Sequence, residues 1–171
     1  MNTVRVGGLF FVVFGLLFAF QAHSADTASV TATVTVENIS VSVSDGTIAY
    51  GTLGQNSTTS TVAGIGNDMQ VATNDGNVTE NLNIKGQNSA SWTLAGAAGA
   101  DEYVHRFCND TDLDCSAPVA NYTALTTNYQ TLDTSIAPAG TVNFQLHINT
   151  TNPSSVYVQQ SVSVTVQALV A

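Results

Sequence analysis

Residues 29–44, SVTATVTVENISVSVS, alternate small or β-branched apolar residues with small polar ones. The apolar residues occupy even positions up to Val36 and odd positions from Ile39 onward. A period of two places one set of side chains on one face of a β-strand, where another layer can bury it. The alternation changes phase at Glu37-Asn38. We therefore expect either two strands, or one strand that bends there and crosses between sheets.

The remainder of the chain repeats this pattern in shorter segments. Further strands are predicted over residues 47–53, 61–63, 69–73, 78–84, 90–94, 103–108, 141–148 and 155–168. Asn74-Asp75-Gly76-Asn77 is the strongest hairpin signal, because these residue types tolerate positive φ. About nine strands and no convincing helix predict an all-β fold, an antiparallel β-sandwich of the immunoglobulin-like or Greek-key kind.

Two segments bear on the core of this sandwich. The strands flanking the polar residues 85–89 read as a second hairpin, with Leu82, Ile84, Trp92 and Leu94 facing inward. Trp92, the sole tryptophan, is expected to anchor the core between two sheets. Within residues 116–132, four residues recur at helical spacing: Tyr122, Leu125, Tyr129 and Leu132. Weak helix formers surround them, so we expect at most a short helical turn.

The N-terminus has the three-part layout of a secretory signal peptide. Residues 1–5 carry one positive charge, residues 6–20 form an uncharged apolar run of 15 residues, and the small residue Ser24 follows. We expect cleavage after Ser24, which leaves residues 25–171 as one β-sandwich domain long enough to bury a core. The run is shorter than the roughly 20 residues that span a bilayer. An uncleaved anchor and a pilin-type leader cut after Gly8 are the alternatives.

The charge balance excludes several classes of partner. The chain has 12 acidic residues against three basic ones and a net charge of −9, and loss of the leader would also remove Arg5. So acidic a surface repels nucleic acid and anionic lipid. We therefore expect no nucleic-acid partner and, after cleavage of the leader, no membrane partner. The composition suits a soluble extracellular protein, or one that gathers divalent cations.

The two cysteines, Cys108 and Cys115, both lie in the part expected to be exported. Export favours a disulfide between them. The segment that they enclose, CNDTDLDC, places Asp110, Asp112 and Asp114 at alternate positions. Calcium takes hard oxygen ligands at this spacing, although the glycine and the distal glutamate of a full EF-hand loop are missing. The loop is thus either a calcium site or a solvated acidic loop closed by a disulfide.

No sequence pattern indicates catalysis. His105 and His147 lie far apart in the chain, and neither belongs to a nucleophile or zinc motif. His147 alternates with the inward residues of its predicted strand and is expected on the outer face. We therefore expect no enzyme, no catalytic residue and no cofactor other than a possible calcium ion.

Two sets of residues concern glycans. Sequons occur at Asn38, Asn56, Asn77, Asn109, Asn121 and Asn149. They matter only if the host glycosylates exported proteins. The tyrosines, Tyr50, Tyr103, Tyr122, Tyr129 and Tyr157, have no spacing diagnostic of a sugar-stacking face, so core and interface roles are expected for them.

One stretch, about residues 40–95, resembles a known family. Ile48-Ala49-Tyr50-Gly51-Thr52, Asn81-Leu82-Asn83-Ile84-Lys85-Gly86 and Ser91-Trp92-Thr93-Leu94 are similar to the first half of WxL domains. Where that family has a second Trp-x-Leu, this chain has Val164-Thr165-Val166-Gln167. The start of the chain also resembles secreted pilin-like sandwich subunits. The resemblance implies an exported bacterial surface β-domain, with Trp92 and Leu94 in its core.

Together these features predict an exported, non-enzymatic structural protein of the cell surface or the extracellular space. It would act by association with a cell-wall polymer or by self-assembly. The long, nearly uncharged segments 29–36 and 155–168 lack the edge lysines that usually block strand pairing, so they could pair between copies. The alternative is a calcium-dependent or glycan-binding adhesion module that uses the loop between Cys108 and Cys115.

Overall fold

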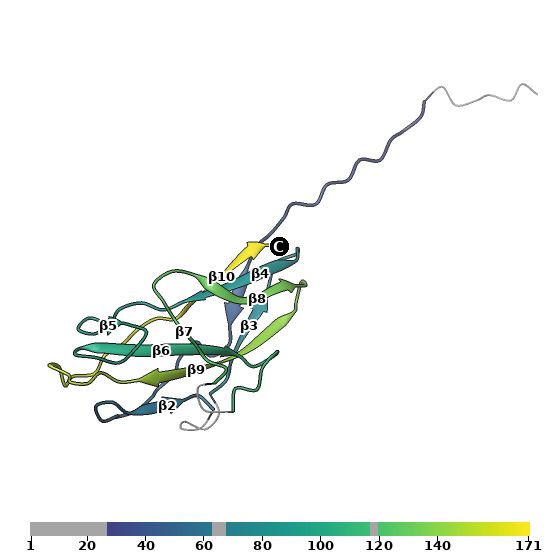
Figure 1. Cartoon of the computed structure of the whole chain (residues 1–171). Helices are drawn as coiled ribbons and strands as arrows, with labels where there is room; N and C mark the ends of the chain where they lie inside the picture. Colours follow the sequence, from purple (N-terminus) through teal and green to yellow (C-terminus); the bar gives the residue numbers. More distant parts are fainter. Residues whose placement is uncertain (1–26, 63–67, 117–119) are drawn as a thin grey trace, which may run out of the picture. The chain divides into compact units, whose positions relative to one another are not determined.

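The computed structural model describes residues 27–62, 68–116 and 120–171 (Figure 1). The chain divides into two units, Met1–Thr35 and Val36–Ala171. In the first unit, the described residues 27–35 form no strand and are exposed. The predicted leader lies outside the described residues, as does the last residue of the strand predicted over 61–63. Thr61 and Val62 are described and form a turn instead of a strand. The second unit contains every strand described below.

Ten strands form two sheets, and the described residues contain no helix. The seven-stranded sheet has the order β1-β3-β9-β6-β5, with β2 also paired to β9 and β7 to β6. Its strands are β1 (Val41–Val43), β2 (Thr58–Ser60), β3 (Gln70–Asn74), β5 (Thr93–Leu94), β6 (Glu102–Asn109), β7 (Thr123–Ala124) and β9 (Thr141–Asn149). The three-stranded sheet has the order β10-β4-β8, with β10 (Thr165–Val170), β4 (Glu80–Lys85) and β8 (Gln130–Ile136). All pairs are antiparallel except β5 with β6, so the predicted all-β, mostly antiparallel architecture is confirmed.

The core lies between the two sheets, which form separate layers in Figure 1. Alternation explains its composition, because β4 and β9 each turn every second side chain inward. The fully or almost fully buried apolar residues are Ala72, Leu82, Ile84, Phe107, Leu125, Leu132, Val142, Phe144 and Leu146. The predicted inward positions Leu82 and Ile84, and those of the strand over 141–148, are therefore confirmed.

The turn at Asn74-Asp75-Gly76-Asn77 is not a hairpin turn. It joins β3 in the larger sheet to β4 in the smaller one, so the chain crosses between layers there. The Asn74 side chain is fully buried and donates to the carbonyls of Val78 and Ile136, while its Oδ1 accepts from the Gly76 N–H. These bonds replace the ladder that a hairpin would supply. A Cβ on Gly76 would lie 2.4 Å from both the Asn38 carbonyl oxygen and Glu80 Oε1, so the close approach requires glycine.

The second predicted hairpin is also wrong. β4 pairs with β10 and β8, whereas β5 pairs in parallel with β6. Trp92 is half-buried and packs against Tyr103, with ring centroids 6.3 Å apart, outside the main core cluster, while Leu94 packs against that cluster. The predicted helical turn within residues 116–132 is absent from the described residues, where β7 and the start of β8 form instead. Leu125 and Leu132 are nevertheless buried.

Besides the strand predicted over 90–94, which shrinks to the two residues of β5, three predicted strands are missing or shortened. Residues 29–36 and 47–53 form no strand, and the long final strand begins only at Thr165. The alternation is present in all three, and Ile48, Tyr50 and Val164 still turn toward the core. Among the described residues, these segments have no neighbouring strand that completes a hydrogen-bonded ladder, and periodicity alone does not supply one.

Candidate functional site

The loop that follows β6 is closed by the predicted disulfide. Cys108 and Cys115 are bonded, with their Cα atoms 5.9 Å apart, and both are buried. Cys108 lies in β6 opposite Gln145 of β9, so the loop is fastened to the centre of the larger sheet. The disulfide is confirmed and leaves no free cysteine among the described residues.

The three aspartates of this loop are held by separate partners. Asp110 accepts from the Gln145 side chain at 3.0 Å, and Asp112 accepts from Asn109 Nδ2 at 3.1 Å. Asp114 is exposed and accepts from Ser116, and these hydrogen bonds lower the pKa of Asp114. Within the described ranges, no three His, Cys, Asp or Glu side chains are arranged to hold a metal ion. The calcium site stays a prediction.

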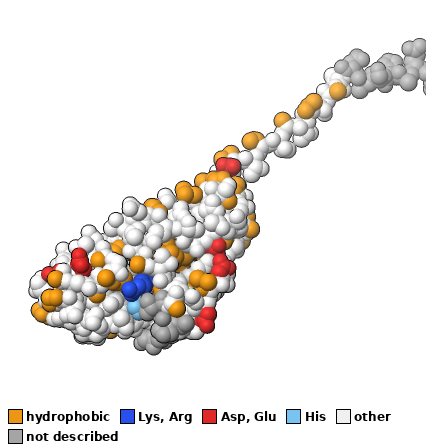
Figure 2. All heavy atoms as spheres, viewed as in Figure 1, with side chains coloured by type: hydrophobic (Ala, Val, Ile, Leu, Met, Phe, Trp, Pro, Cys, Tyr) orange, Lys and Arg blue, Asp and Glu red, His pale blue; other side chains and the backbone are white. Residues whose placement is uncertain are grey.

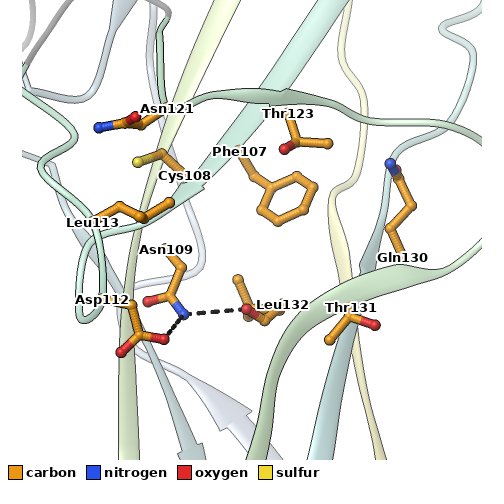
Figure 3. A pocket seen from close by; sticks show the side chains of 10 residues that line it. All are labelled: Phe107, Cys108, Asn109, Asp112, Leu113, Asn121, Thr123, Gln130, Thr131 and Leu132. Carbon is orange, nitrogen blue, oxygen red and sulfur yellow. Dashed lines mark hydrogen bonds between the residues drawn. The ribbon is translucent and has the colours of Figure 1, made fainter.

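Beside this loop lies a hollow of about 340 Å³, shown in Figure 3. Phe107, Asn109 and Asp112 line one side, and Thr131 and Leu132 of β8 line another. Asn109 is 8% exposed, and its Nδ2 donates both to Asp112 and to the Leu132 carbonyl. Because that amide nitrogen is buried and donates two hydrogen bonds, a glycan attached to it in the folded protein would disrupt them.

His105 sits inside the sandwich and is bonded to Tyr50. His105 Nε2 and the Tyr50 hydroxyl are 2.9 Å apart, and His105 Nδ1 has no hydrogen-bond partner among the described residues. Burial, with a smaller effect from nearby His147, lowers the pKa of His105 to about 4. Burial also raises the pKa of Tyr50. A neutral, 3% exposed histidine cannot reach a substrate, so this pair fastens residues 47–53 to β6.

His147 lies on the opposite face of the larger sheet, as its position in the alternation predicts. It is opposite Arg106 in the pairing of β6 with β9, and its Nδ1 is 3.5 Å from an Arg106 guanidinium nitrogen. The Tyr122 ring covers it, with centroids 5.7 Å apart. Burial and then the Arg106 charge lower the pKa of His147. Tyr122 and Arg106 thus cover His147 on the outer face of the sheet. Neither of these two described neighbours is an acid.

Residues 36–40 are fastened to the turn between β3 and β4. Asn77 donates its side-chain amide to the Val36 carbonyl and accepts from the Asn38 N–H through Oδ1, both at 2.8 Å. The Ser40 N–H donates to Glu80 Oε1 at 2.9 Å. Glu80 is fully buried, and its Oε2 has no partner in the described part of the chain. The sequence did not predict that Glu80 is buried and bonded to the Ser40 N–H, although Glu80 is in phase with the inward residues Leu82 and Ile84.

The segment just before this anchor is exposed. Val30 is 94% exposed and Val34 is 90% exposed, although they alternate in the manner of core residues. Residues 27–35 take part in none of the hydrogen bonds of the described chain. The described segment therefore offers both an unpaired backbone and an apolar face.

Charged side chains are sparse on one face of the molecule. Figure 2 shows a face made mainly of uncharged side chains, with acidic and basic groups in isolated places. Lys85 lies over the Tyr129 ring, 4.5 Å from its centroid. Among the described residues, no helix is long and apolar enough to cross a membrane. No protein-family model, curated protein or solved structure matches this chain.

Proposed function

We propose that this chain is an exported, non-enzymatic structural protein of the cell surface or extracellular space that assembles through strand addition between copies. The observation that carries the proposal is the segment 29–36, whose valines alternate and are exposed. The segment has no charged side chain and, within the part of the chain that the structure describes, no strand partner. A strand with an unpaired backbone and one apolar face is stabilised by pairing with an open sheet edge.

Two further observations support an exported protein without catalysis. The disulfide between Cys108 and Cys115 suits an oxidising compartment. His105 is buried against Tyr50, and His147 is covered by Tyr122 and faces Arg106, so each imidazole is engaged in packing. Neither arrangement places a base beside an accessible nucleophile, which acyl transfer and hydrolysis need.

The test compares the assembly of three proteins expressed from the full coding sequence. One is unchanged, one carries Val30→Ser and Val34→Ser, and the control carries Thr31→Ser and Thr33→Ser. Light scattering and negative-stain imaging measure their size. We expect large assemblies from the unchanged and threonine-substituted proteins, and monomers from the valine-substituted protein.

The valine substitutions leave the free protein unharmed, because these side chains are exposed in it. Equal thermal stability of the three proteins, measured at concentrations too low for assembly, checks this point. If all three proteins stay monomeric, or all assemble equally, the proposal is wrong. Binding to a cell-wall polymer is the other mode of the same structural class, and pull-down on envelope fractions then tests it.

A second candidate is the calcium-dependent or glycan-binding adhesion module. The observation in its favour is that the short disulfide-closed loop carries three carboxylates, with Asp112 on the wall of the hollow. Bound calcium would raise the melting temperature, because a ligand of the folded state stabilises it. An unchanged melting temperature at millimolar calcium, in a protein with native structure, would exclude the calcium-dependent form.

A further inference from the structure

The two edges of the smaller sheet differ in how well they are protected from pairing with a further strand. On one edge, β8 has register shifts where it pairs with β4, a positive φ of 60° at Ser135, and the charged residue Asp133. On the other edge, β10 pairs with β4 in an unbroken six-residue register, and residues 155–171 contain no charged side chain. Bulges and charges protect an edge strand from further pairing. Of these two edges, only that of β10 is unprotected.

The other sheet offers no comparable edge. The described strands β1, β2, β5 and β7 each have three residues or fewer. Asp45, with a φ of 60°, and Gly46 follow β1 and end its pairing. The edge of β10 is therefore the longest regular edge that the described strands leave unpaired.

The apolar side chains near this edge are incompletely covered. The buried core residues come mainly from β4 and β9. The half-buried ones include Val164, Val166 and Ala168 on the last segment, and Val41, Ile48 and Tyr50 near the start. Cα atoms of β1 and β10 approach within 8 Å although the two strands are not paired, so both groups border the same side of the sandwich. One more strand there would remove apolar surface from water.

The backbone on this side also lacks backbone partners, although the main chain of Val156 and Val158 is bonded to the side chains of Ser154 and Gln160. Residues 47–53 make no backbone–backbone hydrogen bond within the described chain, and neither do residues 156–164. Tyr157 and Val158 are 79% and 68% exposed. Both segments have strand-like alternation, so what they lack is a pairing partner rather than the propensity to form strands.

We infer that residues 29–36 of one copy add as a fourth strand to the free edge of β10 in a second copy. Val30, Ala32, Val34 and Val36 would cover Val164, Val166 and Ala168. The inference rests on the proposed function and names its acceptor. Asn38 is held by Asn77, so a return of the segment onto its own β10 needs a tight turn before Asn38, and residues 29–37 contain no Gly, Pro, Asn or Asp to make one.

This geometry has a definite consequence for assembly. Each copy has one donor segment and one acceptor edge at different places, so the contact is heterologous. A heterologous contact that does not close into a ring produces an open head-to-tail fibre. The assembled partner is therefore a chain of identical copies and not a symmetric dimer.

The test uses single cysteines in mixtures of two full-length proteins. The donor protein carries Thr31→Cys, Thr33→Cys or Thr35→Cys in turn, so that any register is sampled. The acceptor carries Gln167→Cys on β10, and the matched control carries Thr131→Cys on β8. Gln167 and Thr131 flank the same residue, Asn83, on opposite edges of the sheet. The native cysteines are bonded to each other and buried, so they do not compete.

We expect at least one donor position to form a disulfide-linked pair with Gln167→Cys, at a yield at least tenfold above that with Thr131→Cys. Mass spectrometry identifies the linked peptides. Suppose that assembly depends on Val30 and Val34, but the disulfide link does not favour Gln167→Cys: it forms equally well at both positions, only at Thr131→Cys, or at neither. In that case β10 is not the acceptor, while the proposed function stands. If the unchanged protein does not assemble at all, both fail together.

Discussion

β9 and the C-terminal segment 155–170 have nearly the same sequence pattern but different structures. β9 pairs with β6 along one side and with β3 and β2 along the other, and its inward residues Phe144 and Leu146 are buried. The C-terminal segment forms a strand only over β10, pairs on one side only, and leaves Val166 half-buried. The alternation therefore sets which face of a segment is apolar, whereas the neighbouring strands set how far that face is buried.

The largest expected effect compares these two strands directly. Phe144→Ala removes a ring from the centre of the core, and we expect it to cost about 3–5 kcal/mol of unfolding free energy. Urea denaturation of the monomer measures this loss. The proposed difference in burial between β9 and β10 is contradicted if Phe144→Ala lowers the unfolding free energy no more than Val166→Ala in β10, which is described below.

The next effect concerns the contact between β6 and the unpaired residues 47–53. The pKa of His105 is lowered to about 4 in the folded protein, from about 6.5 when unfolded. Between those values the unfolded state binds more protons. The contribution of His105 to folding stability is therefore fully present above about pH 6.5. It is lost as the pH drops to about 4, which lowers the unfolding free energy by about 3 kcal/mol.

The measurement is the unfolding free energy between about pH 7 and about pH 4. His105→Gln serves as the control, because it keeps a polar side chain but removes the titration. We expect its curve to be flatter by the amount assigned to His105. An equally steep curve in the variant would show that other groups cause the acid sensitivity.

Replacing both cysteines by serine removes the constraint at the end of β6. The seven-residue separation between Cys108 and Cys115 implies a loss of about 2.5 kcal/mol from the greater entropy of the unfolded chain. Denaturation of the variant beside the unchanged protein measures it. Because the loop is on the well-paired side of the molecule, assembly should persist. Loss of assembly in a folded variant would contradict the assignment of the acceptor to β10.

The smallest effect sharpens the comparison at β10. Val166→Ala should cost only about 1 kcal/mol in the monomer, because the side chain is already half-exposed. In the assembled protein the same change should cost more, because the added strand buries Val166 further. Melting curves of monomer and assembly, each with and without the substitution, give both values. Equal costs in the two states would argue against strand addition at this edge.

The sequence predicted the all-β class, the disulfide and the inward faces of β4 and β9, because these follow from local alternation and from two cysteines close together. It did not predict the crossing at Asn74, because that depends on where the Val78 and Ile136 carbonyls lie. Glu80 shows the same limit: its phase with Leu82 was visible, but its bond to the Ser40 N–H joins residues 40 positions apart. Pairing partners and long-range polar contacts are tertiary properties that a period of two does not encode.

Trp92, the one tryptophan, has a practical consequence. Ser89 and Ser91 on its N-terminal side bond to Gln160, and its indole packs against Tyr103. Tryptophan fluorescence therefore originates at a single place, where residues 156–164 meet the segment leading into β5. Unlabelled protein carries its own optical probe there. A shift in its emission during fibre growth would report, in real time, the ordering of a stretch that circular dichroism averages with every other strand.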